Sequence, residues 1–107
     1  MSRAKRKGYA EEKRIADLLG KIPGWSARRQ PGSGAIAGFP GDVLIESPTG
    51  HQFTAESKRR ASGSGFKTLR RWLGANAFLW LREDRTEGMV VMPESVFLEI
   101  IEHWRAE

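Results

Sequence analysis

The sequence reads FTAESKRR from residue 53 to residue 60, and this stretch decides which fold the rest of the chain can adopt. Side chains alternate along a strand, so Phe53 and Ala55 share one face. Glu56 and Lys58 then point together from the opposite face. A carboxylate can bind a hard divalent cation, and an ammonium group can orient a water molecule or stabilise a charged transition state. The pattern therefore indicates either a solvated strand or one edge of a metal-dependent phosphodiesterase site.

A second strand is predicted for residues 41–46, GDVLIE, just before this stretch. The residues 48–50, Pro-Thr-Gly, suit a three-residue hairpin loop with a type I turn closed by a left-handed glycine. The register that this loop sets is Ser47 with His51, Ile45 with Phe53, Val43 with Ala55 and Asp42 with Glu56. Two adjacent carboxylates repel unless a cation lies between them, so this register predicts a metal site. A two-residue loop would instead put Asp42 opposite Ala55.

Composition narrows the class of protein. The 107 residues are 39% hydrophobic and 29% charged, which predicts one small globular domain rather than a disordered chain. The chain has no cysteine and two histidines, which excludes disulfides, thiolate zinc sites and histidine-rich metal sites. No apolar run has the length of a membrane span or signal peptide, so we expect a cytoplasmic protein without a membrane partner. The net charge of +5 and the clustered arginines favour a polyanionic partner, most simply nucleic acid.

A helical pattern covers residues 9–19 and ends at Gly20. The basic residues 2–7 that precede it are expected to form a flexible arm. Both Glu11 and Glu12 stand at helical spacing from the apolar stripe of this helix, so either could face the sheet. Alternatively, both are simply favourable charges in the first helical turn.

The remaining elements complete an α/β pattern. We expect a strand at 25–29, a glycine-rich loop at 30–41, a helix at 66–73, a buried strand at 77–81, a strand at 89–92 and a helix from Pro93 onward. The glycine-rich loop is either a surface connection or a flap that holds phosphates through Ser33 and either Arg28 or Arg29. The order α-β-β-β-α-β-β-α predicts a single domain, residues 1–107, with a mixed sheet flanked by helices.

Two motifs carry a resemblance to a known family. Asp42 followed by Glu56-x-Lys58 resembles the signature of PD-(D/E)xK nucleases, with the proline displaced to Pro40. The run RKGYAEEK, residues 6–13, resembles the amino-terminal signature of archaeal-type (Hjc-like) Holliday junction resolvases. Counting from its glycine selects Glu12 as the third acid of the site. An arginine that leads into a serine-bearing loop, residues 27–34, follows in the order of that family.

The resemblance implies a restriction-endonuclease-like fold and a homodimeric, Mg²⁺-dependent endodeoxyribonuclease that resolves four-way DNA junctions by paired symmetric nicks. Mn²⁺ is expected to substitute for Mg²⁺, and no organic cofactor is expected. The implied catalytic residues are Glu12, Asp42, Glu56 and Lys58, and the implied metal ligands are Asp42, Glu56, the carbonyl of Ser57 and Glu12. We assign DNA contacts to Arg6, Lys7, Lys13, Arg28, Arg29, Ser33, Arg59 and Arg60, and a dimer interface to Leu69, Trp72 and Leu73.

Several alternatives stay open. The chain could be another nuclease of the same superfamily, such as a flap, nicking or restriction-like enzyme. It could also be a non-catalytic DNA-binding module whose acids only shape the fold. Leu69, Trp72 and Leu73 could cover the sheet of their own subunit instead of a partner. The sequence does not decide whether Glu11 can replace Glu12, and it is compatible with a prokaryotic, archaeal or viral origin.

Overall fold

The computed structural model describes residues 3–30 and 41–104, which form an α/β structure divided into two compact units. The first unit contains the chain up to Arg59 together with Trp104, and the second contains Arg60–His103. The described residues form three helices and two small antiparallel sheets. The single domain expected from the length of the chain stays a prediction.

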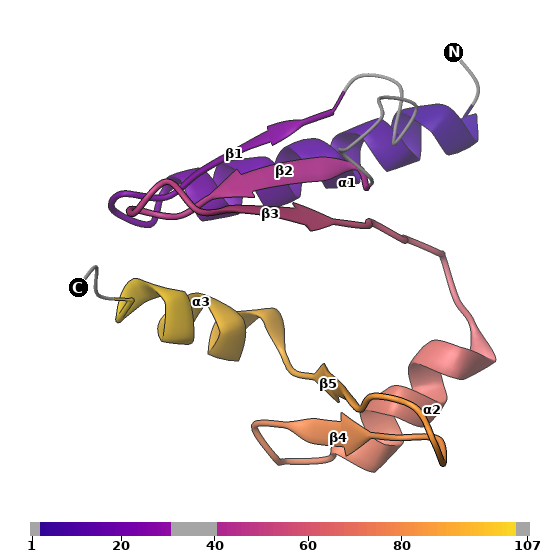
Figure 1. Cartoon of the computed structure of the whole chain (residues 1–107). Helices are drawn as coiled ribbons and strands as arrows, with labels where there is room; N and C mark the ends of the chain where they lie inside the picture. Colours follow the sequence, from indigo (N-terminus) through magenta and orange to yellow (C-terminus); the bar gives the residue numbers. More distant parts are fainter. Residues whose placement is uncertain (1–2, 31–40, 105–107) are drawn as a thin grey trace. The chain divides into compact units, whose positions relative to one another are not determined.

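The first unit is one helix on a three-stranded sheet. Its elements are α1 (Arg3–Gly20), β1 (Ser26–Arg29), β2 (Val43–Glu46) and β3 (Gln52–Ala55), and the strands lie in the order β1-β2-β3. Both strand pairs are antiparallel. The helix runs along one face of this sheet (Figure 1). The middle strand, β2, forms the centre of the core: its apolar residues Val43, Leu44 and Ile45 are all buried.

Aromatic rings extend the core of this unit beyond the middle strand. Trp25, which directly precedes β1, is buried and stacks on Phe53 with ring centroids 6.5 Å apart. Trp104 packs edge-on against the ring of Trp25, with ring centroids 5.7 Å apart, and belongs to the first unit. Large aromatic side chains contribute much buried apolar area, so Trp25 is an anchor of this small core.

The hairpin between β2 and β3 confirms the predicted three-residue loop. Val43 pairs with Ala55 and Ile45 pairs with Phe53. The amide of Gly50 donates to the carbonyl of Ser47 at 2.9 Å, and Gly50 has φ of +85°, the left-handed conformation that the turn requires. Turn chemistry therefore set the register of the hairpin.

β3 ends earlier and β2 begins later than the sequence predicted. β3 stops at Ala55, so residues 56–60 follow the strand instead of continuing it. Asp42 does not extend the ladder opposite Glu56, because its amide donates to the carbonyl of Ala55 at 2.8 Å. The cause is Gly41, whose φ of +94° turns the chain at the start of β2. A Cβ atom on Gly41 would lie 2.9 Å from the oxygen of Ala55, so glycine is required here.

The first helix begins earlier than predicted. It starts at Arg3, so the basic segment expected to be a flexible arm is helical from that residue onward. Arginine, alanine and lysine are strong helix formers, and they outweigh the unfavourable Gly8 that follows the basic segment. The apolar periodicity begins only where the helix meets the sheet, so it does not indicate the first residues of the helix.

Gly8→Ala should stabilise the protein by about 0.5–1 kcal/mol, because Gly8 is helical and a Cβ atom there would meet nothing within 4 Å. Gly41→Ala is the control and should destabilise by about 1–3 kcal/mol, because it combines a positive φ with a close backbone contact. Chemical denaturation of both variants checks this pair. Equal changes in both variants would contradict the two backbone assignments.

The second unit contains α2 (Ser64–Leu73), β4 (Leu79–Leu81), β5 (Met89–Val91) and α3 (Glu94–Glu102). β4 and β5 pair antiparallel in a sheet of their own, so the described strands form two sheets and not the single mixed sheet that was expected. The order of elements along a chain does not determine which strands pair. None of the described helices is long and apolar enough to cross a membrane.

The prediction that β4 is buried is wrong. Trp80 at its centre is 72% exposed, and Met89, opposite the last residue of β4, is 65% exposed. A continuous apolar run is typical of a strand buried on both faces. β4 pairs only with β5, and a two-stranded sheet by itself leaves much of each side chain exposed.

Candidate active site

Buried polar side chains gather at one end of the three-stranded sheet. Glu12, Gln30 and Asp42 are each 7% exposed. Burying a polar group is unfavourable unless it has a hydrogen-bond or ionic partner. The last residue of β1 pairs with the first residue of β2 at this end, and β3 stops beside them. We therefore take this end of the sheet as the candidate site.

Glu12 reaches the site from α1 and is held by Arg29. The guanidinium of Arg29 donates through Nε to Oε1 of Glu12 at 3.1 Å, and its Nη2 lies 3.1 Å from the same oxygen. The edge of the guanidinium binds Glu12, and its flat face lies over the ring of Tyr9, with Cζ 4.0 Å from the ring centroid. The charge of the buried Glu12 is thus balanced by an arginine that is itself packed on an aromatic ring.

Glu11 occupies a different environment from Glu12. Its carboxylate forms an ion pair of 2.6 Å with Arg14 and lies 3.9 Å from Arg59. The hydrogen bond from Arg14 lowers the pKa of Glu11 below its usual value, against the opposing effect of partial burial. Helical spacing left Glu11 and Glu12 as equal candidates and the family resemblance selected Glu12, which is the more buried of the two in the structure.

Asp42 joins the ends of all three strands. Its carbonyl accepts a hydrogen bond from the amide of Gln30 at 2.9 Å, and its amide donates to Ala55. Its carboxylate oxygen Oδ2 accepts a hydrogen bond from the amide of Ser57 at 2.9 Å. Over the part of the chain that the structure describes, no lysine, arginine or histidine lies within ion-pair distance of Asp42. Among the described residues, this buried carboxylate therefore has no compensating cation.

Glu56 and Lys58 follow β3 directly and flank the amide that Asp42 binds. Nζ of Lys58 lies 3.4 Å from Oε1 of Glu56, so the two side chains point the same way. Both side chains are more than half exposed. They are accessible to a large substrate, while Asp42 beside Ser57 is not.

The donor chemistry at this end of the sheet fits a hard divalent cation. Asp42, Glu56 and the carbonyl of Ser57 supply oxygen ligands, which Mg²⁺ and Mn²⁺ prefer. The uncompensated carboxylate of Asp42 is the feature that such an ion would satisfy. Among the residues that the structure describes, however, no three histidine, aspartate or glutamate side chains are already close enough together to hold a metal. Glu12 in particular is engaged by Arg29.

The residues predicted to contact DNA are spread over several elements. Arg6, Lys7 and Lys13 lie on α1, where Lys13 forms an exposed ion pair of 2.8 Å with Asp17. Arg59 follows β3 and approaches Glu11, while Arg60 begins the second unit. Ser33 lies outside the described residues. Leu69, Trp72 and Leu73, predicted at a dimer interface, all lie on α2.

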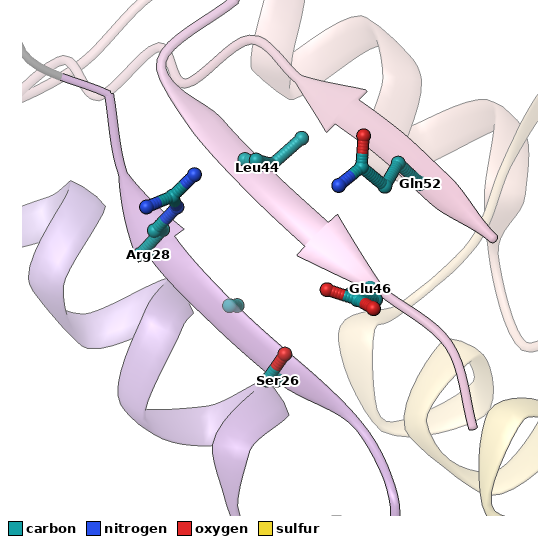
Figure 2. Close-up of a pocket in the computed structure, with 6 residues that line it drawn as sticks. Ser26, Arg28, Leu44, Glu46 and Gln52 are labelled. Atoms are coloured by element: carbon teal, nitrogen blue, oxygen red, sulfur yellow. The ribbon is translucent and has the colours of Figure 1, made fainter. Parts of the chain in front are cut away.

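Arg28 is separated from the buried acids by the sheet. It precedes Arg29, which faces α1, so its side chain lies on the opposite face. Figure 2 shows Arg28, Leu44 and Gln52 on this open face, around a cavity of about 120 Å³. Glu12, Asp42 and Glu56 do not line this cavity. The open face and the acidic end of the sheet are therefore two distinct surfaces.

Two parts of the site were not found from the sequence. Tyr9 precedes Glu12 by three residues on the same helix face, a spacing that could have identified it as a neighbour of the site. Gln30 had no such signal, because a polar residue beside a glycine-rich loop is normally exposed. Its side-chain amide lies 3.5 Å from the carbonyl of Gly41, next to Asp42.

The segments that carry Glu12, Asp42 and Glu56 meet at this end of the sheet, where Tyr9, Arg29 and Gln30 supply the contacts described above. Comparisons with protein-family models, curated proteins and solved structures gave no match.

Proposed function

We propose that the chain is a metal-dependent endodeoxyribonuclease of the PD-(D/E)xK type that resolves four-way DNA junctions. The observation that carries the proposal is the buried Asp42, whose carboxylate accepts a hydrogen bond from Ser57 within Glu56-Ser57-Lys58 and has no cation among the described residues. We further propose that α1 and the first sheet belong to a restriction-endonuclease-like core.

In this proposal, Asp42, Glu56 and the carbonyl of Ser57 hold Mg²⁺, with Glu12 reaching it directly or through water. A bound Mg²⁺ ion would lower the pKa of a water ligand and offset charge on the phosphate. Lys58 would orient the attacking water in line with the scissile bond and stabilise charge on the phosphate oxygens. Water adds to phosphorus and the bond to the 3′ oxygen breaks, which leaves a 5′-phosphate and a 3′-hydroxyl.

A homodimer is part of the proposal, because one site cuts one strand. Symmetric resolution needs two sites related by a two-fold axis. Recognition would depend on phosphates and on the shape of the junction, since none of the three described helices carries an obvious base-reading motif. The basic composition supports a polyanionic substrate but does not choose between branched and linear DNA.

A panel of end-labelled DNAs tests the substrate class. Wild-type protein is incubated with a four-way junction, a 5′ flap, a nicked duplex and a linear duplex, each with Mg²⁺, Mn²⁺ or chelator. We expect paired nicks on opposite strands of the junction, with no cleavage in chelator. Equal cleavage of every DNA would keep the nuclease and remove the junction assignment. Tight binding without cleavage in either metal would overturn the proposal in favour of a binding module.

A further inference from the structure

Helix α2 carries its positive charges on one face. Lys67, Arg70 and Arg71 stand at positions i, i+3 and i+4, which places them side by side on a helix. All three are exposed, whereas Leu69 and Leu73 are partly buried. The helix contains no acidic residue. Within the described parts of the chain, no carboxylate lies within ion-pair distance of these three cations.

Helix stability does not account for this arrangement. Like charges three and four residues apart repel and destabilise a helix. The helix dipole favours Arg70 and Arg71, which lie in the last turn, but it disfavours a cation such as Lys67 in the first turn. An exposed helix could carry glutamate at one of these positions and gain an ion pair instead. The three cations are therefore better explained by a partner than by the helix itself.

We infer that this basic face of α2, formed by Lys67, Arg70 and Arg71, binds backbone phosphates of DNA outside the cleavage site. The inference rests on the proposed function for the identity of the polyanion. Cβ atoms at these spacings lie about 5–6 Å apart, close enough for the three side chains to contact neighbouring phosphates of one strand. Arginine can bind a phosphate through two N–H groups, and lysine acts as a point charge. Such contacts add affinity without sequence preference.

The surface is compatible with the dimer contacts predicted on the same helix. Leu69 and Leu73 stand four residues apart on a second side of α2, with Leu73 next to Arg70 at its border, so one side of the helix can pack against protein while the other meets DNA. A dimer would present two such faces. Junction binding would then depend on phosphates at two places besides the scissile ones.

The test uses a variant that removes all three charges, Lys67→Gln with Arg70→Gln and Arg71→Gln. The matched control removes three exposed cations elsewhere, Lys21→Gln with Arg82→Gln and Arg85→Asn. Asparagine is chosen at Arg85 because this residue has φ of +68°. Binding of a fluorescent four-way junction is measured by anisotropy in chelator, at several salt concentrations. Circular dichroism establishes that each variant is folded.

We expect the α2 variant to bind about tenfold or more weakly near physiological salt, and the slope of log K against log salt to become shallower by roughly 2–3. The control should change the slope by less than about 1. A folded α2 variant with unchanged affinity and slope would overturn the inference while leaving the nuclease proposal intact. An equal change in the control would overturn it too, because the effect would then come from net charge alone.

Other outcomes separate this inference from the proposed function. Suppose that wild-type protein binds the junction, that the slope of log K against log salt is shallower for the α2 variant, and that neither protein cleaves DNA with Mg²⁺. The inference then stands and the nuclease proposal fails. If wild-type protein binds no DNA, both fail. Vesicles rich in phosphatidylserine provide a second arm. Binding of wild-type protein to these vesicles but not to DNA, lost in the α2 variant, would overturn DNA as the partner of this face.

Discussion

Asp42→Asn should abolish DNA cleavage while making the metal-free protein more stable. Asparagine keeps an oxygen that can accept the hydrogen bond from Ser57, so the strand ends stay joined. It removes a negative charge that is 7% exposed and has no cation among the described residues. Burying an uncompensated charge is unfavourable, so its removal should raise the free energy of unfolding in chelator by about 1 kcal/mol or more. Loss of a metal ligand should reduce cleavage on the order of 10³-fold or more.

Urea denaturation in chelator and cleavage of a four-way junction with Mg²⁺ measure the two effects. Asp17→Asn is the control, because Asp17 is exposed and forms an ion pair with Lys13. This control should keep full cleavage and change stability by less than about 0.5 kcal/mol. If Asp42→Asn destabilised the protein, Asp42 would be a structural residue. Cleavage at the wild-type rate by this variant would remove Asp42 from the site.

Arg29→Met should destabilise the fold by about 2–3 kcal/mol. The substitution keeps an apolar stem but leaves Glu12 buried without its cation, and breaking a buried ion pair typically costs about 3–5 kcal/mol. The side chain of Arg29 is 33% exposed, which reduces the expected cost. Its contact with the Tyr9 ring is lost as well, worth about 0.5–1 kcal/mol. A loss of this size should lower Tm by roughly 10 °C or more.

A double-mutant cycle separates the ion pair from other effects of Arg29. Glu12→Gln in the Arg29→Met background should recover most of the lost stability, because no buried charge is then left unpaired. Arg29→Lys should fall between wild type and Arg29→Met, since lysine keeps the charge but not the planar contact with Tyr9. Additive effects of the Glu12 and Arg29 substitutions would show that the two side chains are not coupled.

Local chemistry explains which parts of the fold could be predicted from the sequence. The hairpin register followed from Pro48 and Gly50, because a turn of fixed length leaves one way to pair the strands. The start of α1 and the end of β3 were not predictable in this way. A strand ends where its partner ends, and the turn at Gly41 delays the start of β2 to Val43, one residue after Asp42.

The sequence suggested acids for a candidate site, but not the contacts that they make. The resemblance to a nuclease signature selected Glu12, Asp42 and Glu56, and the segments that carry them meet at one end of the first sheet. The sequence does not show that Arg29 binds the carboxylate of Glu12, because the two residues lie 17 positions apart on a strand and a helix, and no local spacing links them. Long side chains such as arginine can reach several partners, and only tertiary structure decides between them.

Binding of Mn²⁺, followed by electron paramagnetic resonance, tests the central claim most directly: that Asp42 and Glu56 hold one divalent cation between them. Wild-type protein is compared with Asp42→Asn, Glu56→Gln and, as a control, Glu46→Gln, which alters an exposed acid of β2. We expect wild type and the Glu46 variant to bind Mn²⁺, and either substitution at the site to remove this binding. Absence of Mn²⁺ binding by wild type, or its persistence in both site variants, would show that Asp42 and Glu56 do not form a cation site.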